Sequence, residues 1–150
     1  MRDRIKEAVK DAMRAKDSIR LSTLRLMSAA LKDQDIAKRG TNGGDELNEQ
    51  EIISLLAKMI KQREDSIRSY EEAGRMELAE RERAEQKVIR EFLPKQLSED
   101  EVDAAITKAV ADSGAESLRD MGKVMGMLKT AYSGQMDFGV VGGKLKAILG

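Results

Sequence analysis

The sequence predicts an all-α protein, with a four-helix N-terminal domain over residues 1–94 and a three-helix C-terminal domain over residues 95–150. Charged residues make up 36% of the chain, aromatic residues only 3%, and there is one proline. Runs of β-branched residues are scarce, and no Asn-Gly turn is flanked by alternating strands, as a sheet would require. Apolar residues instead recur at the three- and four-residue spacing of amphipathic helices.

The first two predicted helices meet near Asp17. The first should end near Lys16, and Asp17 or Ser18 can cap the second, which extends to Arg39. Their apolar faces consist of Ile5, Val9, Ala12 and Met13 in the first helix and of Leu21, Leu24, Met27, Ser28 and Leu31 in the second. The sequence GTNGGDE, residues 40–46, then predicts a flexible loop.

The third and fourth predicted helices complete the N-terminal domain. Asn48 and Glu51 have the spacing of a capping box, so a helix should start there and continue to about Tyr70. Its apolar face is formed by Ile52, Leu55, Leu56, Met59 and Ile60. The glycine in EEAGR, residues 71–75, predicts a stop, and a fourth helix should follow over residues 76–92.

A domain boundary is predicted around residues 93–97, where the only proline, Pro94, disfavours helix at the residue before it. A second capping box over residues 98–101 starts the fifth helix, which should stop at Gly114. The sixth helix should open at residues 117–120 and end at Gly134. A short seventh helix should follow Asp137.

The composition excludes several classes of protein. The chain has no cysteine and no histidine, so disulfides, thiolate metal sites and the commonest general base are ruled out. No catalytic constellation stands out, and we expect neither a cofactor nor a metal. No apolar run approaches the ~18 residues of a membrane span, and the first residues lack the apolar segment of a secretory signal. A cytoplasmic protein without membrane attachment is therefore expected.

Charge is balanced overall but distributed unevenly. The net charge is zero, which argues against strong non-specific binding of nucleic acid but allows a local basic face. Residues 1–39 carry 11 Lys and Arg against 6 Asp and Glu, whereas residues 45–91 carry 9 against 13. Basic residues form one loose group on the first helix, at Arg2, Lys6, Lys10 and Arg14, and another on the last helices.

The stretch MGKVMGMLK, residues 121–129, contains Gly122 and Gly126 inside a predicted helix. Two interpretations remain open. The methionines could face the core and the glycines could lie under a crossing helix, since the absence of Cβ at i and i+4 leaves a flat strip. Alternatively, the strip could be exposed beside Lys123 and contact a nucleic-acid backbone. The nearby GVVGGK, residues 139–144, lacks the strand and the Ser or Thr of a phosphate loop.

Four motifs in order give the chain a resemblance to the YqeY family (GatB/YqeY domain proteins) over its full length. They are RLSTLRLMSAALKD from Arg20, KQREDSIRSYEEAGRMELAERE from Lys61, REFLPKQLSEDEV from Arg90 and DMGKVMGMLK from Asp120. This family is similar to the tail of the B subunit of aspartyl/glutamyl-tRNA amidotransferase, and that tail contacts tRNA while catalysis lies elsewhere. The resemblance therefore implies tRNA recognition rather than amide transfer.

The residues that match the shared tail motif are Gly122, Lys123, Met125 and Gly134. Family members often have an arginine directly after the glycine that corresponds to Gly134, whereas this chain has Gln135. That difference removes one possible phosphate contact. The predicted RNA-binding residues are Arg119, Gly122, Lys123, Gly126, Lys129, Gly134, Lys144 and Lys146.

Three functions follow as hypotheses. The leading one is a non-catalytic, tRNA-binding accessory protein, with the C-terminal domain as its binding surface. The second is a protein–protein adaptor that docks a helix of a tRNA synthetase or amidotransferase on the apolar face of residues 52–60 or on the methionine-rich helix. The third is carbon–nitrogen ligation with glutamine as amide donor, which the sequence disfavours because it contains no visible pair of nucleophile and base.

Overall fold

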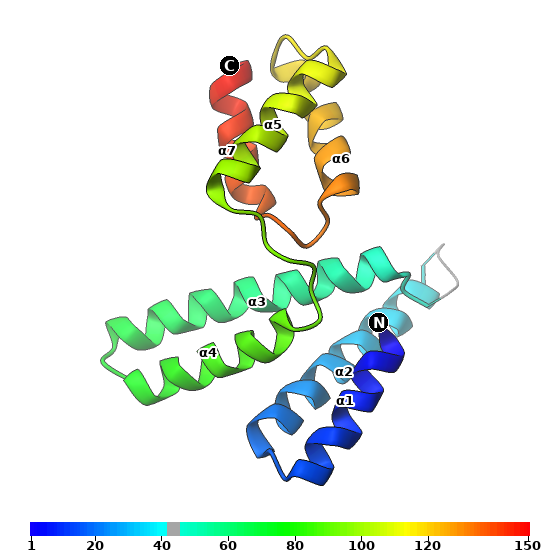
Figure 1. Ribbon diagram of the computed structural model, residues 1–150, viewed down its shortest axis with the longest axis vertical. Helices are drawn as coiled ribbons and strands as arrows, with labels where there is room; N and C mark the ends of the chain where they lie inside the picture. The colour runs from blue at the N-terminus through cyan, green and yellow to red at the C-terminus, as the bar shows by residue number, and fades with distance from the viewer. Residues whose placement is uncertain (42–45) are drawn as a thin grey trace. The chain divides into compact units, whose positions relative to one another are not determined.

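The computed structural model describes residues 1–41 and 46–150, and these residues form helices and no strand (Figure 1). The all-α class predicted from the sequence is therefore confirmed. Most of the predicted loop, at residues 42–45, lies outside the described residues. Contacts between Cα atoms divide the chain into two compact units, Met1–Leu93 and Pro94–Gly150, which are described separately below.

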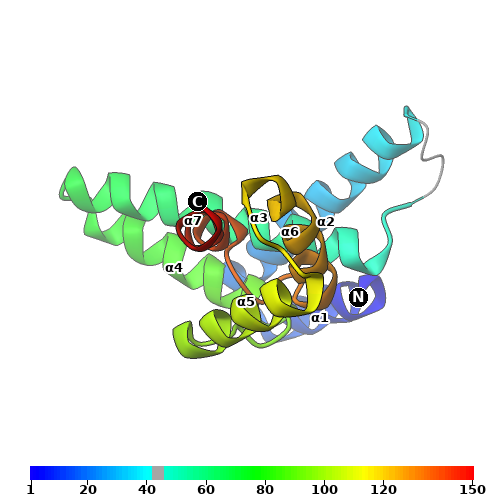
Figure 2. The same ribbon diagram turned by 90° about the horizontal axis from the view of Figure 1, so that it is seen from above.

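The first unit consists of two helical hairpins. Its helices are α1 (Arg2–Ala15), α2 (Ser18–Arg39), α3 (Glu49–Glu72) and α4 (Met76–Arg90). In both views α3 and α4 run side by side, as do α1 and α2 (Figures 1 and 2). The α2 helix also packs on α4 and meets α3 only over a short stretch.

Local capping explains where these helices begin. The Asp17 carboxylate accepts a hydrogen bond from the backbone N–H of Arg20 at 3.1 Å and thereby caps α2. The preceding residue, Lys16, takes a left-handed backbone conformation with φ of 57°, which turns the chain between α1 and α2. The predicted capping box is confirmed at α3, where Asn48 and Glu51 each accept from the other's backbone N–H.

Apolar side chains from all four helices form the core of the first unit. Leu24, Met27, Leu56 and Ile89 are completely buried, and each contributes roughly 1.5–3 kcal/mol by leaving water. The predicted apolar face of α3 belongs to this core, since Ile52 and Ile60 are also buried in it. The hypothesis that this face docks a partner's helix is therefore wrong for Ile52, Leu56 and Ile60, which the unit's own helices cover, whereas Leu55 stays half-exposed.

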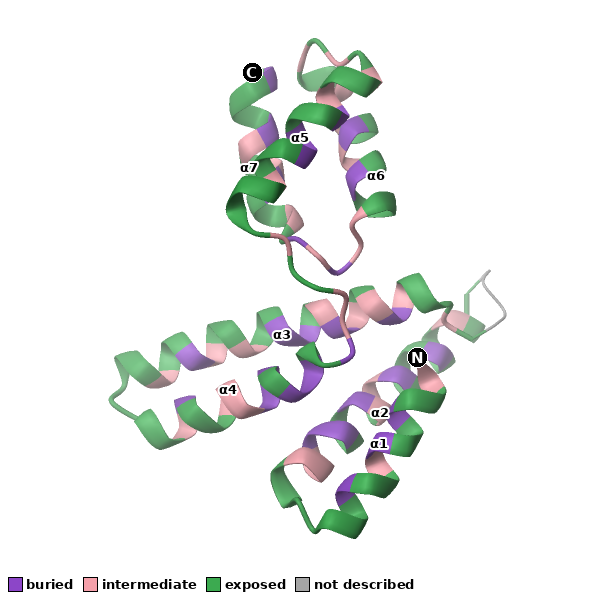
Figure 3. Cartoon of the chain, in the orientation of Figure 1, coloured by how far each residue is buried: buried purple, intermediate pink, exposed green. Residues whose placement is uncertain are grey.

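The second unit has a separate core and three α-helices. These are α5 (Glu99–Ser113), α6 (Met121–Ala131) and α7 (Phe138–Leu149), with a short 3-10 helix, η1 (Leu118–Asp120), before α6. Its fully buried side chains include those of Ile106, Val124, Leu128, Val141 and Leu145. Each unit thus has a buried face of its own (Figure 3).

Three predicted helix ends differ from the structure. The α3 helix continues to Glu72, two residues past the predicted end, and α4 ends at Arg90 rather than Phe92. The α6 helix ends at Ala131, before Gly134, because the half-buried Tyr132 leaves helical geometry and packs against the core of the second unit. Gly134, with φ of 75°, belongs to the turn that follows.

Candidate nucleic-acid interface

The α6 and α7 helices pack as an antiparallel pair, and Gly142 of α7 faces Met121 and Met125 of α6. A Cβ added there would lie 3.7 Å from Met121 Cε and 3.9 Å from Met125 Cε. At the other end of α7, a Cβ on Gly150 would lie 3.9 Å from Leu118 Cδ1, which fixes the antiparallel sense. The glycine that faces the neighbouring helix is therefore Gly142 of α7, and neither Gly122 nor Gly126 of α6.

Gly122 and Gly126 are exposed on the outer surface of α6. No heavy atom lies within 4 Å of a Cβ added at either position. The interpretation that these glycines lie under a crossing helix is therefore wrong. The same interpretation also had the methionines face the core, and this is confirmed for Met121 and Met125, which are half-buried against the core of the second unit. The glycines form a flat strip that is open to a partner.

Cationic residues border this strip. Lys129 follows Gly122 by seven residues, two helical turns, and so lies on the same side of α6. Lys146 follows Gly142 by one turn and therefore lies on the side of α7 that faces α6. Arg119 precedes the strip in η1. Gly122, Lys123, Gly126, Lys129, Lys146 and Arg119 together are called the α6–α7 surface below.

The cations of this surface differ in their partners. The Lys123 Nζ donates a hydrogen bond to the backbone carbonyl of Ser113 at 3.2 Å, which holds the amine near the end of α5. Arg119 and Lys146 are exposed, and neither makes an ion pair within 4 Å among the described residues. Their charges are available to an anionic ligand.

Two of the predicted residues do not lie on the α6–α7 surface. The Lys144 Nζ is 2.6 Å from Asp103 Oδ1 and 3.8 Å from Glu99 Oε1, and the hydrogen bond to Asp103 raises the lysine pKa. This pairing directs Lys144 toward α5. Gly134 is buried, and its carbonyl oxygen accepts a hydrogen bond from the Gln96 side chain. Both residues therefore serve the packing of the second unit.

The acidic groups beside the surface are engaged by backbone amides. Residues 118–149 contain five Lys and Arg against two acidic residues, Asp120 and Asp137. The Asp120 carboxylate accepts from the N–H groups of Glu116 at 2.9 Å and Ser117 at 3.3 Å, and these hydrogen bonds lower the Asp120 pKa. Asp137 accepts from the Gly139 N–H at 2.9 Å and caps α7. Without Lys144, which pairs with Asp103, four cations stand against these two carboxylates, so the surface has an excess of positive charge.

Two features of this region were not found by reasoning from the sequence. Gly139 and Gly143 are exposed on α7, the helix that was predicted to follow Asp137, and they extend the glycine-lined area. The signal was the density of glycines in that stretch. Gln135, which stands where relatives often have arginine, donates from its side chain to the Lys95 carbonyl at 3.1 Å. It therefore has a structural contact of its own.

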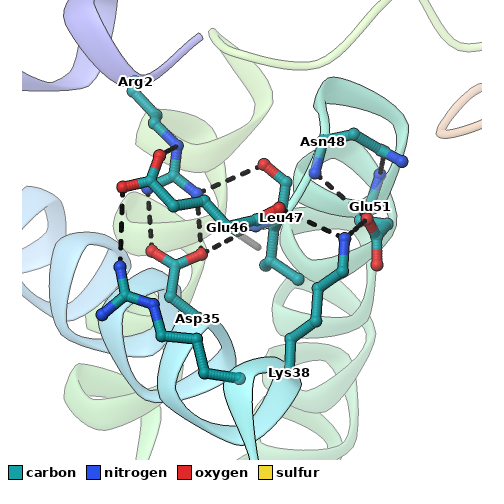
Figure 4. A network of polar contacts seen from close by, with 8 residues as sticks. Arg2, Asp35, Lys38, Glu46, Leu47, Asn48 and Glu51 are labelled. Carbon is teal, nitrogen blue, oxygen red and sulfur yellow. Dashed lines mark hydrogen bonds and ion pairs between the residues drawn. The ribbon is translucent and has the colours of Figure 1, made fainter. Parts of the chain in front are cut away.

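The predicted basic group on the first helix is largely neutralised. Arg2 makes two hydrogen bonds to the Asp35 carboxylate, at 2.7 and 2.9 Å, and Asp35 also accepts from the Leu47 N–H at 2.9 Å (Figure 4). The Arg2 hydrogen bond, followed by that from Leu47, lowers the Asp35 pKa to about 2. This network joins α1, α2 and the start of α3, so Arg2 is a structural residue.

The same network continues to Lys38, whose Nζ lies 2.7 Å from Glu51 Oε1 and 3.2 Å from the Glu46 carbonyl (Figure 4). Further along α1, Lys10 and Arg14 lie 3.6 and 3.5 Å from the carboxylates of Glu7 and Asp11. Lys6 is exposed and makes no ion pair within the described part of the chain, so one cation of this group is unpaired on α1, against Arg119 and Lys146 on the α6–α7 surface.

The fold and the site define an all-helical protein in which a separate three-helix unit carries an electropositive, glycine-lined helix pair. Residues 2–149 match the family described as Yqey-like protein. The chain belongs to the YqeY family, as the sequence motifs predicted. No helix among the described residues is long and apolar enough to cross a membrane.

Known relatives of the chain are fungal proteins named "Altered inheritance of mitochondria protein 41, mitochondrial". The protein from Kluyveromyces lactis is 31% identical over 146 residues, 95% of this chain and 72% of the relative. The one from Lachancea thermotolerans is 33% identical over 110 residues, 72% of this chain and 57% of the relative. The one from Clavispora lusitaniae is 34% identical over 89 residues, which cover 59% of this chain and 49% of the relative. Against several of these relatives, the chain thus spans about half of their length.

Proposed function

We propose that this protein is a non-catalytic accessory protein that binds tRNA through the α6–α7 surface. The observation that supports the proposal most directly is the open space over Gly122 and Gly126, next to unpaired cations at Arg119 and Lys146. Bare helix backbone permits a sugar-phosphate chain to approach closely, and the cations compensate its charge.

The residue types favour recognition of backbone over recognition of bases. The chain has only two tyrosines and two phenylalanines, and Tyr132 and Phe138 of the second unit pack against its core. Stacking platforms for unpaired bases, the usual basis of sequence-specific RNA recognition, are therefore scarce. A structured RNA with a regular phosphate backbone fits this surface better than a single strand. Among structured RNAs, tRNA is chosen because the family resembles the tRNA-contacting tail of an amidotransferase.

Filter binding with total tRNA at ~50 mM salt tests the proposal, because counterion release favours association at low salt. We expect saturable binding by the full chain. The double variant Lys129→Glu, Lys146→Glu should bind at least roughly tenfold more weakly, since it reverses two charges of the surface. Absence of binding by the unaltered chain would contradict the proposal.

The matched control is Lys108→Glu. Lys108 is exposed on α5 and makes no ion pair among the described residues. Reversing its charge therefore changes the net charge as much as each substitution in the double variant does, and it leaves the α6–α7 surface unaltered. We expect tRNA affinity to change little. An equal loss of tRNA affinity in this control would mean that any lysine of the second unit contributes to binding, and this would contradict a defined site.

The proposal places the protein in the cytoplasm, whereas the names of the matched relatives place those proteins in mitochondria. Fractionation of cells that produce this protein tests the location. Recovery in the cytosolic fraction is the expected result, and recovery in an organelle or membrane fraction would contradict it.

A further inference from the structure

The first unit has an apolar groove along α2. One cavity of about 410 Å³ lies between α2 and α3, and a second of about 490 Å³ lies between α2 and α4. Leu26 lines both cavities and lies between them, and the two cavities together are called the groove along α2. Both are open to solvent, since Arg25, Leu26 and Lys58 on their walls are exposed.

The floor of this groove is apolar although part of it is exposed. The Leu26 side chain is 48% exposed, unlike its neighbours Leu24 and Met27, which are completely buried. Ala29 and Ala30 continue the floor on α2, and Leu55 on α3 faces them across the first cavity. Small alanines opposite a leucine leave the space that a partner's larger side chains would fill.

The charges at the base of the groove cancel, whereas those on its rim do not. Arg63 Nε lies 3.0 Å from Glu85 Oε2, and both side chains are largely buried. On the rim are three cations, Arg25, Lys58 and Arg81, and one acid, Asp33. Arg25, Lys58 and Asp33 make no ion pair among the described residues, and Arg81 reaches Glu85 only at 3.8 Å. The rim therefore has a net positive charge.

We infer that this groove binds an amphipathic helix of a partner protein, with a leucine- or methionine-rich face and acidic flanks. An apolar groove receives such a helix through side chains at i, i+3, i+4 and i+7. Acidic flanks would complement Arg25, Lys58 and Arg81. The site lies on the first unit, whereas the α6–α7 surface lies on the second.

A synthetic helical peptide tests this inference on the full chain. The probe is about five turns long, with leucines at i, i+3, i+4 and i+7, glutamates on its flanks and a fluorescent label for polarisation at ~150 mM salt. We expect saturable binding, and at least roughly tenfold weaker binding to Leu26→Asp. Far-UV circular dichroism and the melting temperature check that this variant is folded. We expect a native fold, because Leu26 is half-exposed.

Ile36→Asp is the matched control. Ile36 is also on α2 and is 56% exposed, but it does not line the groove. Its peptide affinity should equal that of the unaltered chain. A variant peptide with lysine flanks should bind at least roughly tenfold more weakly than the acidic one, and Lys58→Glu, which leaves two cations against two acids on the rim, should abolish that preference.

Several results would overturn the inference. These are no binding of the acidic peptide at about 200 µM, equal losses in Leu26→Asp and Ile36→Asp, or no preference between acidic and basic flanks. Self-association of the chain that Leu26→Asp abolishes, measured by sedimentation, would assign the groove to a second copy instead. Displacement of the peptide by total tRNA from the chain with Lys129→Glu and Lys146→Glu would assign it to RNA.

Discussion

Gly122 and Gly126 weaken α6 by roughly 1 kcal/mol each relative to alanine, yet neither is needed for packing within the chain. The helix forms because Val124 and Leu128 bury its other face in the core of the second unit. A residue that costs stability without a packing role is expected where function requires an open backbone. This is the residue-scale reason to regard the α6–α7 surface as a binding site.

Replacement of Gly126 by alanine should stabilise the protein. The backbone there is helical and the space is open, so Gly126→Ala should raise the unfolding free energy by about 0.5–1 kcal/mol. Gly114→Ala is the contrasting control and should lower it by about 1–2 kcal/mol, because φ is 69° at that position. Chemical denaturation measures both. A loss of stability in Gly126→Ala would mean that the glycine is structural.

The sequence could predict which residues carry charge, but not which charges are free. Lys144 and Lys146 are two residues apart, so they lie on nearly opposite sides of a helix, but the sequence does not say which side meets an acid. The structure pairs Lys144 with Asp103 and leaves Lys146 exposed, since the two side chains lie on different sides of α7. Which acid stands opposite a lysine depends on how α5 packs on α7, and no local pattern contains that information.

At the scale of elements, the best predicted features were the helix starts. Asn48 and Ser98 begin α3 and α5 through capping boxes, which are local and contained within four residues. Helix ends were less predictable, because the end of α6 depends on how Tyr132 packs against the core. The groove along α2 was also not predictable, because it depends on how far α2 stands from α3.

Asp35 links three elements, so its neutralisation should destabilise the first unit. Asp35→Asn should cost about 1–3 kcal/mol, because Arg2 and the Leu47 N–H lose a charged acceptor. The folded-state pKa is lowered to about 2, so this stabilisation is fully present above about pH 4 and is lost as pH falls through about 2. Denaturation from pH 7 to pH 2 should show the two proteins converging. A difference independent of pH would contradict this account.

The ion pair between Arg63 and Glu85 joins α3 to α4 in a buried setting. Glu85→Ala should destabilise the chain by about 1–3 kcal/mol, because Arg63 would lose its carboxylate partner and keep only its hydrogen bond to the Met59 carbonyl. Glu80→Ala on the same helix removes an exposed ion pair with Arg83 and should change stability little. Thermal unfolding distinguishes them, and similar melting temperatures would show that the buried pair contributes no more than the exposed one.

At the scale of the whole molecule, the chain consists of two units, each with its own core. A fragment over residues 94–150 should therefore fold alone, although a domain of about 60 residues buries only ~60% of its unfolded surface and is marginally stable. Circular dichroism should show helix and a cooperative melt. A fragment without cooperative unfolding would mean that the second unit depends on the first for its stability.

The central claim is that the α6–α7 surface binds tRNA through its phosphate backbone. The most direct measurement is the dependence of tRNA affinity on salt concentration for the unaltered chain and for Lys146→Glu. A logarithmic plot should be linear with a negative slope, and the variant should lower the affinity and make the slope shallower by about one unit. Undetectable binding at ~50 mM salt, or a slope unchanged by the variant, would contradict the claim.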